Sequence, residues 1–364
     1  MSSSIIQPNK YIEGLKGPLF VAGPCSAETE EQVMATARAI SQIKSVKVYR
    51  AGVWKPRTRP NAFEGNGEQA LKWLQQVKPA TGLLTAVEVA NAEHLELCLK
   101  YNVDIVWIGA RTTVNPFSVQ EIADGLKGVD IPVFIKNPIN PDLKLWIGAI
   151  ERISKAGIHK IAAIHRGFQA YENSVYRYSP MWDIPIELMA AIPDLPVICD
   201  PSHITGKRSM VAETAQKAMN LGMHGLMIES HLSPDDAWSD AAQQITPQTL
   251  AELLKNIKIR TQSTDDLAVN DELKHLRTII DSIDEELLGV IAKRMKAIEK
   301  IGNYKRQHNV AIFQPDRLAE ILKTRKQFGD NLQLDSDFIE KLLLELHSES
   351  IRYQTEIVYK PTLE

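Results

Sequence analysis

Short apolar runs rich in Val, Ile and Leu alternate with longer segments of helical periodicity up to about residue 260. This alternation is typical of repeated βα units around a parallel sheet. Eight such units in a segment of this size predict an α/β fold, a closed (β/α)8 TIM barrel. The predicted strands are 19–25, 46–52, 83–89, 105–110, 133–138, 161–167, 197–203 and 225–231.

The pattern changes after this region. The stretch TQSTDDLA at 261–268 is polar and has no apolar periodicity, and the remaining pattern is purely helical. We expect a long helix at about 268–308, a short helix that begins at Pro315, and a third helix at about 335–357. The predicted organisation is a barrel domain at 1–260, a linker at 261–267 and a small all-α three-helix domain at 268–357.

Charge and composition limit the classes of molecule that the protein is expected to bind. The 364 residues include 42 basic and 45 acidic ones, a net charge of -3, without the positive excess of a nucleic-acid binder. No apolar run has the length of a membrane span, and the N-terminus lacks the pattern of a secretory signal. Three cysteines without regular spacing suit a reducing compartment. We therefore expect a cytoplasmic protein that binds small molecules, not nucleic acid or a membrane.

Each predicted strand has a functional side chain at its C-terminal end or just beyond it. Barrels of this type place their active sites at that end. Cys25, His203, Glu229 and, in the loop after the eighth strand, Asp240 combine a thiol, an imidazole and two carboxylates, which suit a divalent transition metal. The alternative for Cys25 is a small hydrophobe packed in the core. The full set of strand ends is Cys25, Arg50, Glu88, Arg111, Lys136, Arg166, His203 and Glu229.

Basic residues crowd the same rim of the predicted barrel. Their mutual repulsion is tolerable if anions bind there, because Arg captures phosphate or carboxylate with two hydrogen bonds and Lys acts as a point charge. Phosphorylated, carboxylated substrates fit this arrangement better than the alternative of a solvated basic patch. The residues are Arg50, Lys55, Arg57, Arg111, Lys136 and Arg166.

Seven motifs in order resemble the type I beta form of 3-deoxy-D-arabino-heptulosonate 7-phosphate (DAHP) synthase, the first enzyme of the shikimate pathway. The related 3-deoxy-D-manno-octulosonate 8-phosphate synthases are the alternative, but they typically have a KANRS-like segment where this chain has Lys55-Pro56-Arg57-Thr58. The motifs are AGPCSAE (22–28), YRAGVWKPRTRP (49–60), GARTT (109–113), FIKNP (134–138), HRG (165–167), DPSH (200–203) and IESH (228–231).

The resemblance implies that phosphoenolpyruvate condenses with erythrose 4-phosphate to give DAHP and phosphate. It assigns one divalent metal ion, Mn2+ or a similar transition metal, to Cys25, His203, Glu229 and Asp240. Lys136 and His203 would take part in proton movement. Phosphoenolpyruvate would bind to Arg50, Lys55, Arg111, Lys136 and Arg166, and erythrose 4-phosphate to Lys55, Pro56, Arg57 and Thr58.

The first predicted helix of the C-terminal domain has an apolar seam at 273, 276, 280, 283, 287, 290, 297 and 301, interrupted by Arg294. An arginine in such a seam needs an anion, either a ligand or an internal carboxylate such as Glu345 or Glu349. Arg277 and Lys305 are about 42 Å apart along one helix at its standard rise. If both serve one pocket, Arg277 comes from a second, antiparallel copy, so we expect at least a dimer through this domain.

These spacings resemble chorismate mutase of the all-helical AroQ type over residues 268–357. The resemblance implies rearrangement of chorismate to prephenate, with Arg294, Lys305 and Gln354 as catalytic residues. Two positions depart from the family: Gln314 replaces an Asp, and Leu318 replaces a Glu that commonly contacts the substrate hydroxyl. The implied residues for chorismate and prephenate are Arg277, Arg294, Lys305, Gln314, Arg317, Ser350 and Gln354.

The roles of the helical domain stay open at this point. It is an active mutase, or a sensor that binds chorismate or prephenate and restrains the barrel, or both. The departure at Leu318 favours the sensor. A third alternative, a hairpin that only dimerises, conflicts with the charge at Arg294 in its seam.

Overall fold

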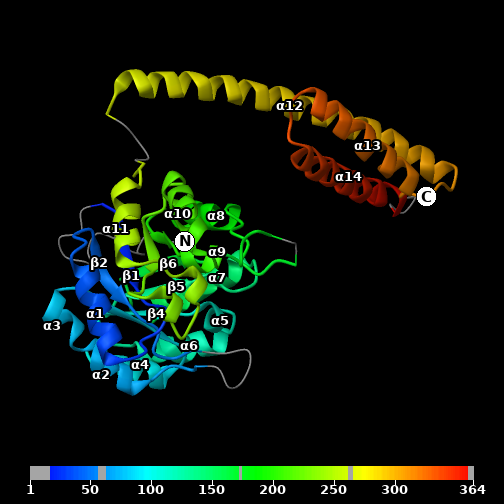
Figure 1. The fold of residues 1–364 in the computed structure, drawn as a ribbon. Helices are drawn as coiled ribbons and strands as arrows, with labels where there is room; N and C mark the ends of the chain where they lie inside the picture. Colours follow the sequence, from blue (N-terminus) through cyan, green and yellow to red (C-terminus); the bar gives the residue numbers. More distant parts are fainter. Residues whose placement is uncertain (1–16, 56–62, 172–173, 261–264, 360–364) are drawn as a thin grey trace. The chain divides into compact units, whose positions relative to one another are not determined.

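The computed structural model describes residues 17–55, 63–171, 174–260 and 265–359. The chain divides into two compact units, Met1–Gln262 and Ser263–Glu364. In the first unit parallel strands pair in chain order and β1 pairs again with β8, which confirms the predicted closed barrel (Figure 1). The strands are β1 Leu19–Gly23, β2 Val46–Arg50, β3 Leu84–Val89, β4 Ile105–Ile108, β5 Val133–Lys136, β6 Ile161–His165, β7 Val197–Cys199 and β8 Gly225–Glu229.

Helices surround the barrel, and several begin where the sequence provides a capping side chain. Thr29, Asn91 and Asp142 each accept a backbone N–H of the first turn, which satisfies donors that the helix leaves unpaired. The helices are α1 Glu30–Ser41, α2 Glu68–Leu74, α3 Val77–Thr81, α4 Ala92–Lys100, α5 Ala110–Thr113, α6 Pro116–Gly125, α7 Leu143–Lys155, α8 Asp183–Ala191, α9 Pro201–Thr205, α10 Val211–Asn220 and α11 Pro247–Asn256.

Two apolar layers hold the barrel. Trp107, Phe134 and Met227 belong to the cluster that fills its interior, and a larger cluster lies between the strands and the helices. On α7, Trp146 is fully buried and its indole N–H donates to the carbonyl of Ile135 at 3.1 Å. Burial of each large side chain contributes about 1.5–3 kcal/mol, so the strand ends stand on a rigid frame.

Glycines allow the strands on either side of β1 to approach it closely. A Cβ on Gly225 would lie 2.0 Å from the carbonyl oxygen of Leu19, and one on Gly23 would lie 2.0 Å from that of Arg50. Gly23 also has φ +153, in the region that other residues rarely adopt. The ends of β8, β1 and β2 therefore come together.

The second unit consists of α12 Leu267–Gln307, α13 Pro315–Asn331 and α14 Ser336–Tyr359. The middle helix begins at Pro315 as predicted and, with 17 residues, is shorter than α12 and α14, which have 41 and 24. Gly302 of α12 is buried beneath Ile357 of α14: a Cβ there would lie 3.0 Å from its Cδ1 atom. Of the helices among the described residues, none combines the length and the apolar character that crossing a bilayer requires.

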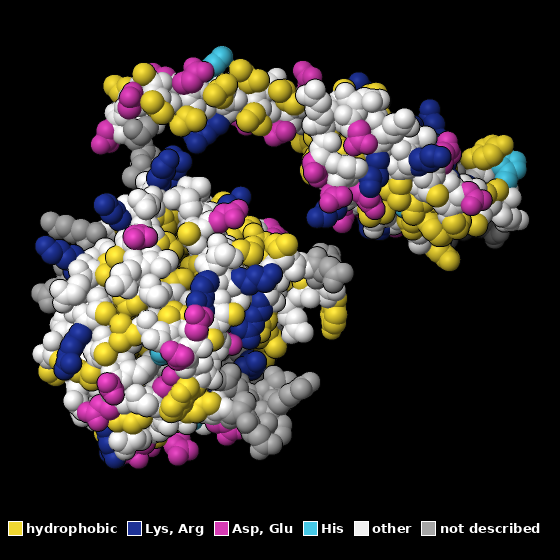
Figure 2. Space-filling model, viewed as in Figure 1, with side chains coloured by type: hydrophobic (Ala, Val, Ile, Leu, Met, Phe, Trp, Pro, Cys, Tyr) yellow, Lys and Arg dark blue, Asp and Glu magenta, His cyan; other side chains and the backbone are white. Residues whose placement is uncertain are grey.

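The N-terminal half of α12 exposes apolar side chains along much of its length, visible as yellow atoms in Figure 2. Soluble monomers rarely expose a continuous apolar stripe of this kind. The exposed residues include Leu273, Leu276, Ile280, Ile283, Leu287 and Val290.

Candidate active sites

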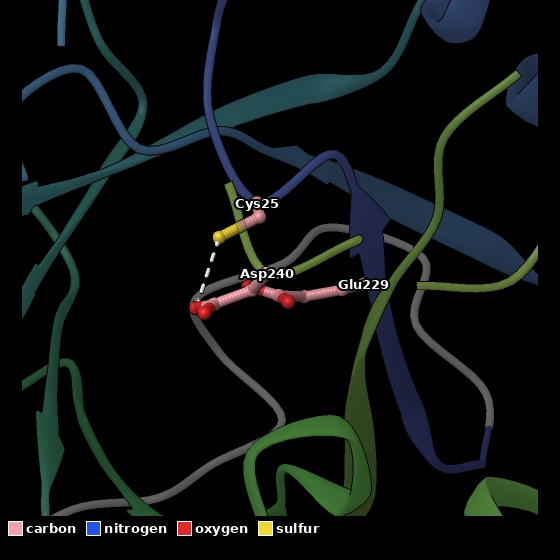
Figure 3. A group of neighbouring side chains, drawn as sticks. All are labelled: Cys25, Glu229 and Asp240. Atoms are coloured by element: carbon pink, nitrogen blue, oxygen red, sulfur yellow. Dashed lines mark hydrogen bonds between the residues drawn. The ribbon is translucent and has the colours of Figure 1, made fainter. Parts of the chain in front are cut away.

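Three of the four predicted metal ligands converge at the end of the barrel. One ligand atom from each of Cys25, Glu229 and Asp240 lies within 4.8 Å of the others (Figure 3). Cys25 follows β1, Glu229 ends β8, and Asp240 lies in the loop after β8. The backbone of Asp240 is left-handed, φ 46 and ψ 38, an uncommon conformation for a residue other than glycine. Such strain persists where surrounding contacts impose it, often at functional sites.

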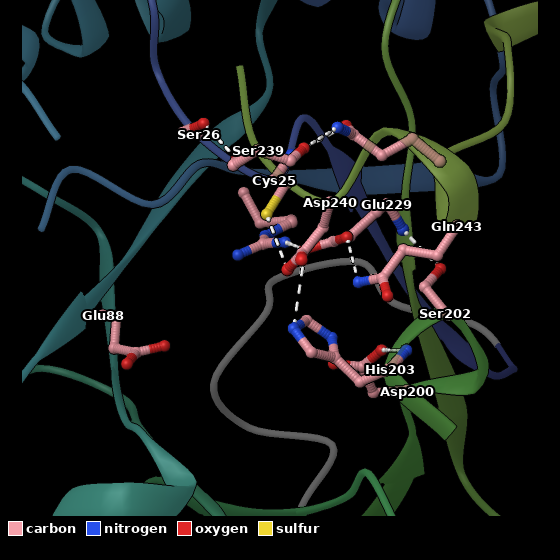
Figure 4. A network of polar contacts seen from close by, with 12 residues as sticks. Cys25, Ser26, Glu88, Asp200, Ser202, His203, Glu229, Ser239, Asp240 and Gln243 are labelled. Carbon is pink, nitrogen blue, oxygen red and sulfur yellow. Dashed lines mark hydrogen bonds and ion pairs between the residues drawn. The ribbon is translucent and has the colours of Figure 1, made fainter. Parts of the chain in front are cut away.

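His203 reaches the same place from α9. The predicted strand 197–203 was wrong beyond Cys199, because Pro201 begins a helix that Asp200 caps. Nε2 of His203 lies 3.7 Å from Oε1 of Glu229, and Nδ1 lies 2.7 Å from Oδ2 of Asp200 (Figure 4). A carboxylate at one imidazole nitrogen orients the other toward a ligand, the arrangement usual in metal-binding histidines.

The charges at this point favour a cation. Burial and then the charge of Glu229 raise the pKa of the Cys25 thiol to about 12. Burial also acts to raise the pKa of Glu229 and Asp240, but neighbouring positive groups, His203 foremost, outweigh it and lower both. Two charged carboxylates thus face a buried thiol, and a divalent ion there would favour the thiolate.

A cavity of about 210 Å³ opens beside these residues, and four of the five predicted phosphoenolpyruvate-binding cations are on its wall. Nζ of Lys136 lies 2.9 Å from Oδ2 of Asp200, and Nζ of Lys55 lies 2.8 Å from Sγ of Cys25. Lys136 is therefore held in place by a carboxylate, and Lys55 by a hydrogen bond to the sulfur of Cys25. The cavity is lined by Lys55, Glu88, Ala110, Arg111, Lys136, Ile139, Arg166, Arg177, Tyr178, His203 and Asp240.

The two buried arginines differ. Arg50 is not among the lining residues: Nη1 lies 2.5 Å from Oε1 of Glu229, and the guanidinium lies over the Trp107 ring at 4.8 Å. Arg166 does line the cavity. Its guanidinium lies 3.5 Å from the centre of the Tyr178 ring, and its buried Nη1 has no hydrogen-bond partner among the described residues. Arg166 is thus a ready donor for an anion. Pro56, Arg57 and Thr58 lie outside the described residues.

Sequence reasoning missed Arg177 and Tyr178 on the cavity wall. Both come from the long connection after β6, far from a strand end. Nη1 of Arg177 lies 3.1 Å from Oδ1 of Asp240 and 2.9 Å from Oε1 of Gln243. The stem of Arg177 passes so close to Gly206 that a Cβ there would meet it at 2.7 Å. In the sequence, the glycine at 206 is consistent with such a close approach, but it does not indicate that Arg177 is the neighbour.

In the second unit a cavity of about 1010 Å³ lies among α12, α13 and α14. Nη1 of Arg294 donates to Oγ of Ser350 at 2.7 Å and to the carbonyl of Leu346 at 3.2 Å. Among the described residues Arg294 therefore pairs with neither Glu345 nor Glu349, so the alternative of one of these internal carboxylates as its partner is wrong. Six of the seven predicted ligand residues line this cavity: Arg294, Lys305, Gln314, Arg317, Ser350 and Gln354.

Polar atoms without partners face this region. Oε1 of the buried Gln354 and Nε2 of His347 have no hydrogen-bond partner among the described residues. His347 lines the cavity and was not predicted; it stands three residues before Ser350 on α14, hence on nearly the same face. Arg277, the seventh predicted residue, is exposed in the first half of α12 and does not line the cavity.

Comparison with known proteins gives two matches along the chain. The DAHP synthetase I family model matches residues 4–265, and the chorismate mutase type II model matches residues 276–355. Phospho-2-dehydro-3-deoxyheptonate aldolase of Thermotoga maritima is 32% identical over 239 residues, which cover 66% of this chain and 68% of that protein. The T-protein of Haemophilus influenzae is 32% identical over 90 residues, 25% of this chain and 24% of that one.

The barrel also matches in three dimensions. A crystal structure of the Thermotoga maritima phospho-2-dehydro-3-deoxyheptonate aldolase (DAHP synthase) superposes with a TM-score of 0.58 at 30% identity, over 66% of this chain and 67% of that one. Family model, relative and structure agree on the first unit, and the motifs that suggested the resemblance lie within the matched residues. The chain therefore belongs to the DAHP synthetase I family, and its C-terminal segment is a chorismate mutase type II domain.

Proposed function

We propose that the barrel is a metal-dependent DAHP synthase, which condenses phosphoenolpyruvate with erythrose 4-phosphate and releases phosphate. The convergence of Cys25, Glu229, Asp240 and His203 beside a cavity lined with cations carries this proposal. A thiol, an imidazole and two carboxylates are the donors that a transition metal such as Mn2+ accepts. When bound, the ion would supply Lewis acidity toward the aldehyde oxygen of erythrose 4-phosphate.

The protein's own residues would then position the second substrate. Arg166 and Arg111 on the cavity wall would bind the phosphate and carboxylate of phosphoenolpyruvate, and Lys136 would stand beside them. This fixes the nucleophilic C3 of phosphoenolpyruvate against the aldehyde carbon, where a carbon–carbon bond forms. Water adds at C2 and the C–O bond to phosphate breaks. Arg50 does not line the cavity and would contribute indirectly, because its ion pair with Glu229 holds that carboxylate in place.

Lys136 and His203 both contact the carboxylate of Asp200. Both can carry a proton, and their shared partner keeps them within one hydrogen-bonded group. This supports the proposal that they move protons during the condensation. The segment Lys55–Thr58 would bind erythrose 4-phosphate, with Lys55 beside Cys25 at the edge of the cavity.

For the helical unit we infer that the cavity binds chorismate and rearranges it to prephenate. The reaction is intramolecular, so the pocket must hold a compact conformer and stabilise developing charge. Arg294 and Arg317 would bind the carboxylates, while Lys305 and Gln354 lie on the same wall as donors for the ether oxygen. Assays of both reactions on the intact chain and on its Arg294→Ala and Lys136→Ala variants test the two assignments separately.

A dimer through the second unit is part of the proposal. Arg277 lies on the same half of α12 as the exposed apolar stripe, away from its own cavity. An antiparallel second copy would cover the stripe and bring its own Arg277 to this pocket. A sensor role remains a second candidate, favoured by Leu318 at the position of the usual hydroxyl contact. Prephenate formation at no more than the background rate by the intact chain would leave only the sensor.

A further inference from the structure

The loop that presents Asp240 is attached to the segment that follows β1. The attachment point is Glu28, which is 5% exposed. Its Oε1 accepts the backbone N–H of Trp238 at 2.8 Å and the hydroxyl of Ser26 at 3.3 Å. Glu28 is close to Cys25 in the sequence, whereas Trp238 is 210 positions away from Glu28. One buried carboxylate therefore joins the two segments that carry metal-ligand candidates.

Two further contacts join the same segments. The hydroxyls of Ser26 and Ser239 are hydrogen-bonded to each other, as Figure 4 shows. The side chain of Gln244 accepts the N–H of Cys25 at 2.9 Å and donates to the carbonyl of Ser239 at 2.8 Å. All four residues are buried. The contacts fix the two residues that lead into Asp240.

This attachment matters because Asp240 has the strained left-handed backbone described above. An uncommon backbone conformation of this kind persists where surrounding contacts impose it, and this one directs the Asp240 carboxylate toward Cys25. Arg177 holds the carboxylate from the cavity side. The contacts of Glu28 and Ser239 hold the backbone of the loop instead. They act at Trp238 and Ser239, the two residues that directly precede Asp240.

We propose that Glu28 is a positioning residue: it holds the loop after β8 so that Asp240 faces Cys25 and Glu229 and completes the metal site. The inference rests on the proposed metal-dependent function. Contacts behind the ligands typically affect metal affinity about 10–100-fold when they are removed. The competing explanation is a buried acid that only stabilises the barrel, through His231, whose Nε2 lies 3.6 Å from Oε2 of Glu28.

The two explanations differ in what a substitution changes. Loss of positioning weakens metal binding in a folded protein, and restoring an acceptor for the Trp238 N–H rescues it. Loss of stability alone lowers the unfolding temperature and leaves the metal affinity of the folded protein unchanged. Glu28→Ala removes the acceptor, and Glu28→Gln keeps a carbonyl oxygen that can accept. Glu31→Gln is the matched control, because Glu31 is exposed on the adjacent first turn of α1.

The experiment titrates the metal-free full-length chain with Co2+ and measures the dissociation constant and the thiolate-to-cobalt absorption band of Cys25. Thermal unfolding is recorded for each variant without metal. We expect Glu28→Ala to bind Co2+ at least about 10-fold more weakly with an altered band. Glu28→Gln should recover most of the affinity, and Glu31→Gln should match the wild type.

Ser239→Ala provides an independent test that leaves no buried charge unpaired, so it is expected to fold even if Glu28→Ala does not. It should also weaken Co2+ binding and alter the band. Wild-type affinity and an unchanged band in the folded variants would overturn the inference. If the wild-type chain itself bound no Co2+, the proposed metal-dependent function would fail instead, so the two failures are distinguishable.

Discussion

Asp200 contacts His203 through Nδ1 at 2.7 Å, and the other imidazole nitrogen of His203 faces Glu229. Asp200 is fully buried, and the positive charges of His203 and Lys136 overcome the effect of burial and hold its pKa well below the usual range. The ring is therefore oriented by a permanent negative charge. Any metal bound at Nε2 depends on that orientation.

Asp200→Asn should consequently lower the affinity for Mn2+ or Co2+ by about 10–100-fold. The amide oxygen can still cap α9, so the helix should persist. The measurement is a metal titration of the purified chain, and the exposed Asp194→Asn serves as its control. Equal metal affinity in both variants would show that Asp200 does not orient His203 for binding.

Removal of the metal should separate the two activities. Exhaustive chelation is expected to abolish DAHP synthesis, and addition of Mn2+ should restore it, because the proposed ligands lie in the barrel. Prephenate formation should continue at the same rate, since the helical cavity relies on cations and amides. The same sample is assayed for both products. Full synthase activity after chelation would contradict the role of Cys25 and His203.

Arg294→Ala should lower the mutase rate by about 10²–10³-fold, the usual effect of losing one donor to developing charge. We also expect prephenate to inhibit DAHP synthesis, and this substitution should remove the inhibition because Arg294 lies on the cavity wall. Lys293→Ala, exposed at the neighbouring position, is the control. Inhibition that persists unchanged in Arg294→Ala would exclude the helical cavity as the regulatory site.

His347 should couple ligand binding to pH. Burial, followed by the positive charges of Arg294 and Lys305, lowers its pKa in the free protein. A bound dicarboxylate would offset those charges and raise the pKa. Between the two pKa values the complex holds a proton that the free protein lacks, so affinity for prephenate should increase as pH falls through that interval.

Calorimetric titrations with prephenate between about pH 5 and pH 8 would measure this slope. His347→Gln should flatten it, whereas His308→Gln, at an exposed position, should not. The same slope in all three proteins would mean that another group takes up the proton.

The exposed seam of α12 should control assembly. Ile280 and Ile283 are 56% and 57% exposed. Replacing both with Asp is expected to produce a monomer with little mutase activity, because Arg277 could no longer reach a second copy's pocket. Sedimentation analysis and the mutase assay test this together. Glu285→Lys changes charge away from the seam and should stay dimeric. A dimeric double variant would place the interface elsewhere.

The positions of Cys25 and Glu229 followed from strand order, because closure of the barrel makes the first and last strands neighbours. The pattern of apolar runs was sufficient for that prediction. The same pattern could not indicate that Arg50 forms an ion pair with Glu229. A sequence does not distinguish a cation that binds a substrate from one that pairs with an internal carboxylate. That distinction depends on how the ends of β8, β1 and β2 lie together.

Residues on long connections were harder to predict. Arg177 reaches Asp240 only through the course of the chain after β6, and that course has no periodic pattern. His347 was overlooked for a different reason: it was not among the residues that the resemblance assigned. Spacing along α14 places it near Ser350, but only the packing of α12 and α14 brings it near Arg294 and Lys305.

Cys25 and Asp240 are 215 positions apart in the chain, yet their side chains lie within 3.5 Å. During synthesis, Cys25 emerges from the ribosome long before its partners, as a lone thiol without a second donor. The candidate donors cannot come together until the eighth strand and the following loop have left the exit tunnel. Closure of the barrel is therefore the earliest stage of synthesis at which the complete donor set can exist.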